Sequence, residues 1–300
     1  MTTIETNFPI IQNPFDKESY LKGEYSDKLQ FSDYLLLNWR NNTYIIETPE
    51  SSHKEAVFPP HPESAYISSL IPHPKRNQKY FLDVGVGSGI LSIDAAKKGW
   101  KTIGVDINPK AIKIASINAK LNDVQCKFQI DNLAKNQNEN FFDFCIANLP
   151  FEPTPSGKLN FTHSDGGVYG DKLIKEFIPI VENLMKTDGF VILPSFSLFK
   201  NDESDLEKHL KGLNKINFSK AIIRLSQPLE LSLLSSRFEN SRDAYKYLTK
   251  EGYSHFVIDV GLLKKTNEES GFIGILDRKD IADRSWIMPL VRNSFKKVKQ

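Results

Sequence analysis

Residues 80–89 read Tyr-Phe-Leu-Asp-Val-Gly-Val-Gly-Ser-Gly, and the rest of the fold is worked out from this stretch. Its first half, residues 80–84, is a short apolar run that ends at a glycine, which is typical of a buried strand. Its second half has glycine at alternate positions, and residues 90–98 follow with helical spacing. The sequence therefore predicts a strand, a sharp glycine turn and a helix, in that order.

The same alternation continues for the next hundred residues. Further strands are predicted at residues 102–105, 126–130, 142–147 and 190–194, with helices at residues 110–121 and 173–185. Strands that alternate with helices over this length indicate an α/β fold with a doubly wound parallel sheet. Right-handed crossovers place the carboxyl ends of all these strands at one edge, where a ligand should bind.

Less regular segments lie on both sides of this core. The predicted flanking elements are a helix ending near Leu37, a strand at 43–46, a helix within 63–71, a helix at 206–213, a strand at 221–225, a helix at 243–250 and a strand at 255–263. We therefore expect an N-terminal extension of residues 1–55, which is a candidate for substrate recognition. A domain of residues 56–265 follows, with an insertion at about 226–252, and residues 266–300 form a C-terminal extension.

Composition excludes several classes of protein. Hydrophobic residues make up 40% and charged residues 25%, which is ordinary for a globular chain and unlike a disordered one. The net charge of +2 gives no overall basic excess that would demand a nucleic-acid partner. Two cysteines form neither a disulfide framework nor a four-cysteine zinc site, and they fit a reduced, cytoplasmic chain. No apolar run approaches the ~20 residues of a membrane helix, so we expect no membrane association.

The glycine turn has the chemistry of a ligand site, because glycine lets a ligand approach the peptide planes closely. Dinucleotide enzymes use the spacing G-x-G-x-x-G, whereas Gly85, Gly87 and Gly89 have the spacing G-x-G-x-G. Asp83 precedes them, and its carboxylate would repel a pyrophosphate but attract an ammonium group. These features favour S-adenosylmethionine, with Ser88 also in the binding turn, over a plain tight turn without a ligand.

Two more carboxylates follow predicted strands. Asp106 lies 21 residues past the first glycine of the turn, near the ~20 residue spacing of a ribose-binding carboxylate, and Ile107 follows it. Asp131, beside Asn132, has two interpretations. Its carboxylate could accept a hydrogen bond from an adenine amino group, or it could cap the segment that follows.

The tetrapeptide Asn148-Leu149-Pro150-Phe151 comes at the end of the predicted fourth strand. The side-chain oxygen of Asn148 and the main-chain oxygen of Pro150 could accept both protons of an –NH2 group, which would aim its nitrogen at a methyl carbon. Phe151 could stack on a flat substrate group. This chemistry needs no metal and no strong base, since positioning supplies much of the catalysis. The alternative is a turn that serves only conformation.

Taken together, these residues resemble the class I S-adenosylmethionine-dependent methyltransferases, and within them the HemK type of amino and amide N-methyltransferases. Residues 60–64, Pro-His-Pro-Glu-Ser, resemble the family segment P-x-P-E-T, and residues 165–170, Asp-Gly-Gly-Val-Tyr-Gly, resemble D-G-G-x-x-G. The resemblance covers roughly residues 57–195. It implies a Rossmann-like sheet of seven strands with the last antiparallel, S-adenosyl-L-methionine as cofactor and S-adenosyl-L-homocysteine as product.

The tetrapeptide departs from the family pattern N-P-P-Y at Leu149 and Phe151, and N-L-P-[FY] also occurs in adenine N6-methyltransferases of ribosomal RNA. The resemblance therefore implies methylation of an amide or amino nitrogen, with a protein glutamine as first candidate. The alternative is an exocyclic amine (adenine N6 or guanine N2) of RNA or DNA, and the third is a catalytically silent binding protein. The near-neutral charge favours a protein or small-molecule acceptor over nucleic acid. The sequence does not indicate the oligomeric state.

The insertion at about 226–252 is expected to select the acceptor together with residues 1–55. The strand at 221–225 should run parallel to the others, so the chain leaves it at the ligand edge, and an antiparallel strand at 255–263 would need only a short turn. Loops as long as this one are usually functional. Within it, Arg237 and Arg242 would meet an acidic or amide-rich partner. The alternative is a helix that only covers the sheet.

Overall fold

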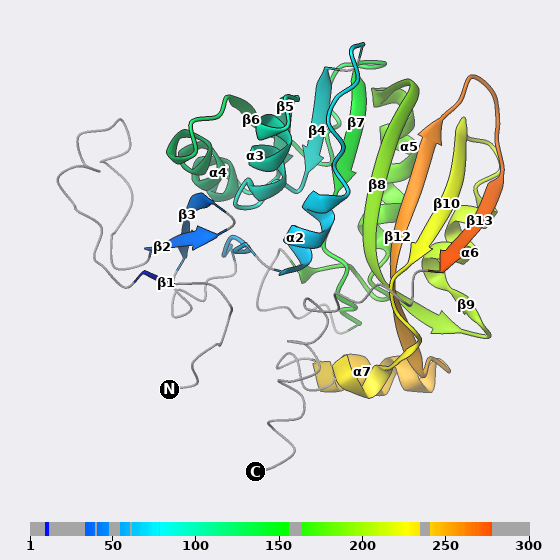
Figure 1. The fold of residues 1–300 in the computed structure, drawn as a ribbon. Helices are drawn as coiled ribbons and strands as arrows, with labels where there is room; N and C mark the ends of the chain where they lie inside the picture. The colour runs from blue at the N-terminus through cyan, green and yellow to red at the C-terminus, as the bar shows by residue number, and fades with distance from the viewer. Residues whose placement is uncertain are drawn as a thin grey trace.

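The structure, a computed structural model, describes residues 10–11, 34–39, 41–47, 55–60, 62–77, 79–155, 164–234 and 241–277. Its centre is one large sheet, shown in Figure 1. From edge to edge the strands are β13 (Phe272–Asp277), β10 (Phe218–Arg224), β12 (His255–Lys265), β8 (Met185–Lys200), β7 (Phe142–Ala147), β4 (Tyr80–Val84), β5 (Lys101–Asp106) and β6 (Cys126–Ile130). A short strand, β9 (Glu203–Ser204), pairs with the end of β8.

The strand directions are those of the predicted doubly wound sheet. The neighbours β6, β5, β4, β7 and β8 run parallel, and β12 is antiparallel to both β8 and β10. β10 therefore points the same way as the central strands, as the sequence predicted for residues 221–225. β13 adds a further parallel strand outside β10, so the sheet continues past residue 265 into the C-terminal extension.

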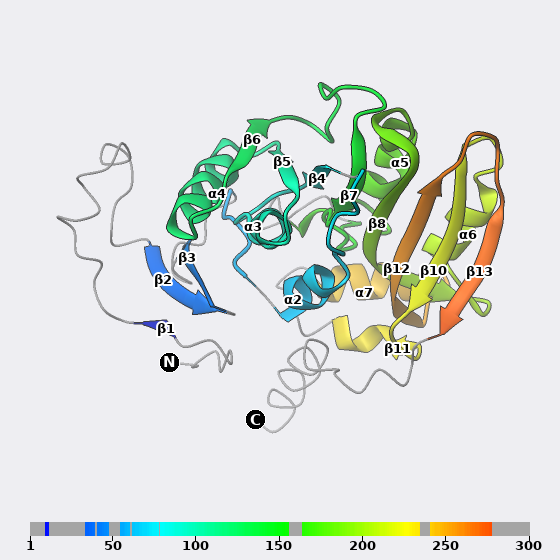
Figure 2. The ribbon, with the colours of Figure 1, turned by 45° about the horizontal axis from the view of Figure 1, so that its top comes forward.

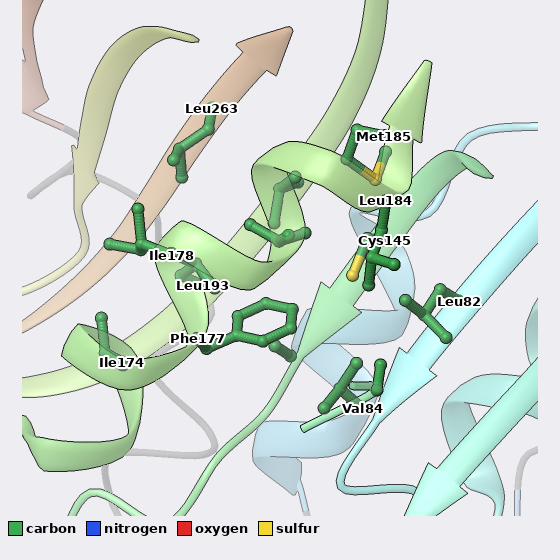
Figure 3. Close-up of a cluster of buried hydrophobic side chains, with 14 of the residues drawn as sticks. Leu82, Val84, Cys145, Ile174, Phe177, Ile178, Leu184, Met185, Leu193 and Leu263 are labelled. Atoms are coloured by element: carbon green, nitrogen blue, oxygen red, sulfur yellow. The ribbon is translucent and has the colours of Figure 1, made fainter. Parts of the chain in front are cut away.

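Side chains that alternate along the strands build two separate cores, one on each face of the sheet. On one face, Phe81 of β4 and Phe144 of β7 pack with α2 (Pro62–Ser69) and α3 (Ile90–Lys97). On the other face, Leu82 and Cys145 pack with α5 (Lys172–Leu184) and α6 (Asp205–Gly212). Figure 3 shows this second core, with Phe177 and Ile178 of α5 lying over the strands. Adjacent residues of one strand thus serve opposite layers, as buried parallel strands require.

The N-terminal part forms a hairpin, which corrects the prediction of a helix ending near Leu37. Residues Tyr34–Trp39 form β2, which pairs with β3 (Asn42–Glu47) and with β1 (Ile10–Ile11). Asn41 lies in the tight turn with a φ of 61°, a conformation that asparagine tolerates better than most residues. The prediction was wrong because the apolar run was taken by itself, without the asparagine turn that folds it back. Figures 1 and 2 both show β3 beside α4 (Pro109–Leu121).

The insertion lies at the ligand edge of the sheet. It contains β11 (Leu229–Glu230), the 3-10 helix η3 (Leu231–Leu234) and α7 (Ser241–Lys250). β11 pairs with the first residues of β12, which lie at the carboxyl edge of the parallel strands because β12 is antiparallel. Figure 1 shows α7 below that edge. No helix among the described residues is long and apolar enough to cross a membrane.

Asp143 of β7 connects the start of β4 with the first residues of β8. Its Oδ2 accepts hydrogen bonds from the N–H groups of Lys79 (2.9 Å) and Tyr80 (3.0 Å), and Lys186 donates to both carboxylate oxygens at 3.0 Å. Burial opposes the charge of this carboxyl, but these N–H groups and the Lys186 ammonium outweigh it and bring the pKa of Asp143 below its ordinary value. The carboxylate therefore contributes stability at neutral pH.

We predict that Asp143→Ala lowers the free energy of unfolding by about 2 kcal/mol, because hydrogen bonds to a charged group are lost. A lowered pKa means that this contribution is present above the ordinary pKa of Asp and is lost as the pH falls through the folded-state value. The difference between wild type and variant should therefore shrink below about pH 4. Urea titrations at several pH values measure this, with the exposed Glu139→Ala as control. A difference independent of pH would contradict it.

Candidate functional site

The glycine turn is folded over the end of β5 by backbone hydrogen bonds. The N–H groups of Gly85 and Val86 both donate to the carbonyl of Val105, at 2.9 and 3.0 Å. Gly85, Gly87 and Gly89 have φ values of 77°, 51° and 84°, which L side chains rarely adopt. Glycine is thus required by the backbone at all three positions of the pattern.

Close packing imposes a second requirement on the turn. A Cβ atom on Gly85 would lie 3.2 Å from the backbone oxygen of Asn148, and one on Gly89 would lie 3.0 Å from the Cβ of Ala115 in α4. By contrast, a Cβ on Gly87 would meet nothing nearer than the Phe58 carbonyl at 3.9 Å. The turn therefore touches the tetrapeptide after β7 on one side and α4 on another, and it is open around its middle glycine.

Asp83 is a buried carboxyl with one unused oxygen. Its side chain is 1% exposed, and Oδ2 accepts a hydrogen bond of 2.7 Å from the hydroxyl of Ser92. Oδ1 is buried and has no hydrogen-bond partner among the described residues. The pKa of Asp83 is raised to about 7, chiefly by burial and to a smaller extent by the charge of Asp106, although the hydrogen bonds of Ser92 act to lower it. Such a group fits a site that gains a cationic partner when a ligand binds.

Ser92 is a member of this site that the sequence interpretation missed. It is fully buried in the first turns of α3, and its hydroxyl is directed at Asp83. The sequence did contain a signal for this contact, because Ser92 lies on the apolar side of the predicted helix. A hydroxyl group buried there needs a hydrogen-bond partner.

Asp106 lies beside the glycine turn, where its carboxylate contacts the middle glycine. Its Oδ2 accepts a hydrogen bond from Gly87 N–H at 3.0 Å, and its Oδ1 accepts one from Asn108 N–H at 2.9 Å. These bonds fix the orientation of the carboxylate at the turn. Ile107 beside it is 67% exposed, which leaves an apolar side chain free to cover a ligand.

The carboxylate of Asp131 is hydrogen-bonded to the turn that follows it. Its carboxylate accepts hydrogen bonds from the backbone N–H and the side chain of Asn136, and from the side chain of Gln137 at 2.9 Å. It is 4% exposed, while the neighbouring Asn132 is exposed. The arrangement favours the capping interpretation of Asp131 over the contact with adenine.

The tetrapeptide combines anchored residues with an unused acceptor. Leu149 is buried in the core under α5. The Oδ1 atom of Asn148 is buried and has no hydrogen-bond partner among the described residues. Phe151 is partly buried, and its ring lies 4.6 Å from that of Phe196 at a tilt of 51°. Pro150 between them is also partly buried.

Residues 164–170 form a brace behind the tetrapeptide. Gly166 N–H donates to the Glu152 carbonyl at 2.9 Å, and Thr154 N–H donates to the Gly167 carbonyl at 2.7 Å. A Cβ on Gly170 would lie only 2.3 Å from the carbonyl oxygen of Phe151. The glycines of this segment are therefore needed so that two backbones can approach, and the brace fixes where Phe151 lies.

Comparison with known proteins agrees with this geometry. Residues 63–153 match the family described as ribosomal protein L11 methyltransferase (PrmA). A protein of Methanocaldococcus jannaschii, provisionally named a protein N5-glutamine methyltransferase, is 36% identical over 185 residues, which cover 59% of this chain and 89% of that protein. The chain belongs to the class I S-adenosylmethionine-dependent methyltransferases.

Two further matches are proteins named for ribosomal protein L11. The ribosomal protein L11 methyltransferase of Dictyoglomus turgidum is 39% identical over 116 residues, 37% of this chain and 38% of that protein. The crystal structure of a ribosomal protein L11 methylase from Lactobacillus delbrueckii subsp. bulgaricus is 20% identical with a TM-score of 0.44, and the match covers 70% of this chain and 81% of that one. The chain thus spans well under half of the Dictyoglomus protein.

S-adenosylmethionine is the cofactor of the methyltransferase, and the residues present fit it. The unpartnered Oδ1 of Asp83 suits the ammonium of its amino-acid end, the fixed Asp106 carboxylate suits ribose hydroxyls, and the open middle of the turn leaves room for close approach. The placement of the cofactor on these residues is our proposal.

The first test of this placement compares two carboxylates of the methyltransferase. We predict that Asp106→Ala weakens S-adenosylmethionine binding by at least ~1.5 kcal/mol, because hydrogen bonds to a charged group are lost. Asp131→Ala should instead lower the free energy of unfolding by about 2 kcal/mol and change the cofactor affinity by less than about twofold. Calorimetry and urea titration measure the two quantities. A large loss of affinity in Asp131→Ala with unchanged stability would restore the adenine interpretation.

The second test uses the pH dependence of binding. An ammonium beside Asp83 stabilises the ionised carboxylate, so binding releases a proton wherever Asp83 is protonated in the free protein. Because the pKa of Asp83 is about 7, affinity should rise with pH up to and through that value and then level off. Asp83→Asn should bind more weakly and lose this part of the profile. Identical profiles of wild type and variant between about pH 6 and 8 would rule out the contact.

Arg242 lies exposed on α7, whereas Arg237 lies outside the described residues. The insertion is joined to the brace through aromatic rings, since the centroid of Tyr169 lies 6.4 Å from that of Tyr247 and 6.1 Å from that of Tyr253. This contact links the insertion to the segment that positions Phe151.

Proposed function

We propose that this methyltransferase methylates an amide or amino nitrogen, and that a protein glutamine side chain is its acceptor. The observation that carries the proposal is the buried Oδ1 of Asn148, which has no hydrogen-bond partner among the described residues. It belongs to the residue whose backbone oxygen touches the cofactor turn at Gly85. A buried acceptor without a donor costs free energy, and a substrate –NH2 group would supply that donor.

Two residues of the tetrapeptide, Asn148 and Pro150, would together orient the acceptor nitrogen. S-adenosylmethionine supplies a methyl group on a sulfonium, which is an intrinsically reactive donor. The Asn148 side-chain oxygen and the Pro150 carbonyl oxygen would each accept a hydrogen bond from one N–H of the acceptor –NH2, which fixes the plane of that group. With the methyl donor bound, this orientation would let the nitrogen bond to the methyl carbon while the carbon–sulfur bond breaks, and the extra proton on the nitrogen would pass to solvent water. Catalysis here comes from holding the nitrogen in line.

Phe151 would form one wall of the acceptor site. Its ring is supported by Phe196, and its backbone is held by Gly166 and Gly170 of the brace. A planar carboxamide or a flat base could stack on such a ring. The insertion with α7, which contacts the brace at Tyr169, would form a further wall and select the molecule that carries the acceptor. The hairpin of β2 and β3 in residues 1–55 is the other segment proposed to take part in this selection.

The names of the relatives support a protein acceptor. The Methanocaldococcus relative is named for the N5 nitrogen of a protein glutamine, and the Dictyoglomus relative for ribosomal protein L11. The net charge of +2 also supports a protein acceptor, since binding to phosphates requires a surplus of lysine and arginine. The alternative, an exocyclic amine of RNA or DNA, has in its favour only the sequence Asn-Leu-Pro-Phe.

A labelling experiment separates these acceptors. The protein is incubated with tritiated-methyl S-adenosylmethionine and a cell lysate, which is then fractionated into protein, nucleic acid and small molecules. We expect label in the protein fraction and, after digestion, on a glutamine side chain. Label in nucleic acid would favour the exocyclic amine instead. Label in no fraction, with the cofactor still bound, would favour the silent binding protein.

Turnover of Asn148→Ala tests the role of the tetrapeptide. We predict that kcat on the labelled acceptor falls by ~10² or more while the cofactor affinity changes little, because Asn148 orients the nucleophile. The control is Asn183→Ala, an exposed asparagine near the end of α5 at the opposite edge of the sheet. Near-normal turnover of Asn148→Ala would mean that the tetrapeptide is only a turn.

A further inference from the structure

The outer edge of β3 is paired with a helix. In α4, Asn118 accepts a hydrogen bond from Ile45 N–H at 2.7 Å and donates to the Ile45 carbonyl at 3.2 Å. One helical turn later, Asn122 accepts from Thr43 N–H at 2.9 Å and donates to the Thr43 carbonyl at 2.6 Å. Two carboxamides thus replace the strand that would otherwise satisfy this edge.

Of these two asparagines, only Asn118 also contacts the glycine turn, residues 85–89, where the cofactor is proposed to bind. Its Nδ2 also donates to the carbonyl of Ser88 at 2.9 Å, and its side chain is fully buried. The N–H of the same peptide group, that of Gly89, donates to the Val86 carbonyl at 2.8 Å. The peptide between residues 88 and 89 is therefore held at both its oxygen and its nitrogen, so its plane cannot rotate without breaking a buried hydrogen bond.

Other contacts bring the N-terminal extension close to the turn. Glu47, at the end of β3, forms an ion pair with Lys110 at the start of α4. Further along the chain, the Glu55 carbonyl accepts a hydrogen bond from the Asn108 side chain at 2.9 Å. The extension is thus fastened to α4 at several points, and α4 itself is packed against the turn at Gly89.

We infer that Asn118 is a positioning residue for the cofactor turn, and that it couples docking of the N-terminal hairpin to cofactor affinity. The inference rests on the proposed placement of S-adenosylmethionine at the turn. It gives residues 42–47 a function in addition to selecting an acceptor, because the docked hairpin helps to hold the peptide planes that the cofactor approaches. By linkage, bound cofactor must stabilise the docked hairpin by the same factor by which docking strengthens binding.

Asn122 provides a matched control. Asn118→Ala and Asn122→Ala each remove one pair of hydrogen bonds to β3, but only the first removes the bond to Ser88. We expect Asn118→Ala to raise the Kd and the KM for S-adenosylmethionine about tenfold, as loss of a buried hydrogen bond implies. Asn122→Ala should stay within about twofold, although both variants shift the midpoint of unfolding.

Hydrogen exchange of the wild-type protein tests the coupling without a variant. Added S-adenosylmethionine should slow exchange of the amides in residues 42–47, and Ile45 most of all, because its N–H is bonded to Asn118. The same protection should persist in Asn122→Ala and disappear in Asn118→Ala. If the cofactor leaves exchange in β3 of the wild type unchanged, the hairpin and the turn are not coupled and the inference fails.

The binding results also separate this inference from the cofactor placement. If Asp106→Ala weakens binding while Asn118→Ala and Asn122→Ala affect it equally, the cofactor lies at the turn and Asn118 has no special role. If Asp106→Ala leaves binding unchanged, the placement itself is wrong. Should Asn118→Ala not fold, the exchange experiment on the wild type decides the matter.

Discussion

The whole site depends on the contact between two backbones at the carboxyl edge of the sheet. β4 and β7 are hydrogen-bonded neighbours, with Val84 opposite Ala147, so the residues after each strand meet directly. A Cβ on Gly85 would come within 3.2 Å of the Asn148 carbonyl, and only glycine permits that approach at a positive φ. The register of two parallel strands therefore sets the separation between the glycine turn and the tetrapeptide. Because both strands are buried on both faces, this register cannot slip without exposing a core.

The sequence was informative wherever a pattern was local. The strand, turn and helix of residues 80–98 were predicted because apolar runs, glycines and helical spacing report on adjacent residues. Right-handed crossovers then predicted that the strand ends share one edge, whereas the order of the strands comes from the structure. The helix ending near Leu37 was wrong because the hairpin depends on pairing across the turn at Asn41. No strand was predicted for β13 within the C-terminal extension, because an edge strand with Ile273 76% exposed lacks the buried pattern of a central strand.

The contacts that the sequence could not supply are all long-range. Nothing near Gly170 in the chain indicates that its Cα must lie against the backbone of Phe151, and nothing near Asn118 indicates a partner in a hairpin about seventy residues earlier. Asp131 had two equal interpretations because a carboxylate after a strand can serve a ligand or a turn. The hydrogen bonds from the side chains of Asn136 and Gln137, which favour the capping interpretation, are visible only in the folded turn.

Among the described residues, four buried side-chain atoms have no hydrogen-bond partner, and two of these, Asp83 Oδ1 and Asn148 Oδ1, belong to the candidate site. The other two are Thr102 Oγ1 and His209 Nε2. Asp83 and Asn148 both belong to neighbouring strands or their ends, on either side of the glycine turn. A fold selected only for stability would replace or pair such groups, since each costs about 1–3 kcal/mol when left alone. The Asp83 carboxylate would be stabilised by a cation, and the Asn148 amide oxygen would be stabilised by an N–H donor. The proposed methyl donor, with its ammonium group, and the proposed –NH2 acceptor would supply these two partners.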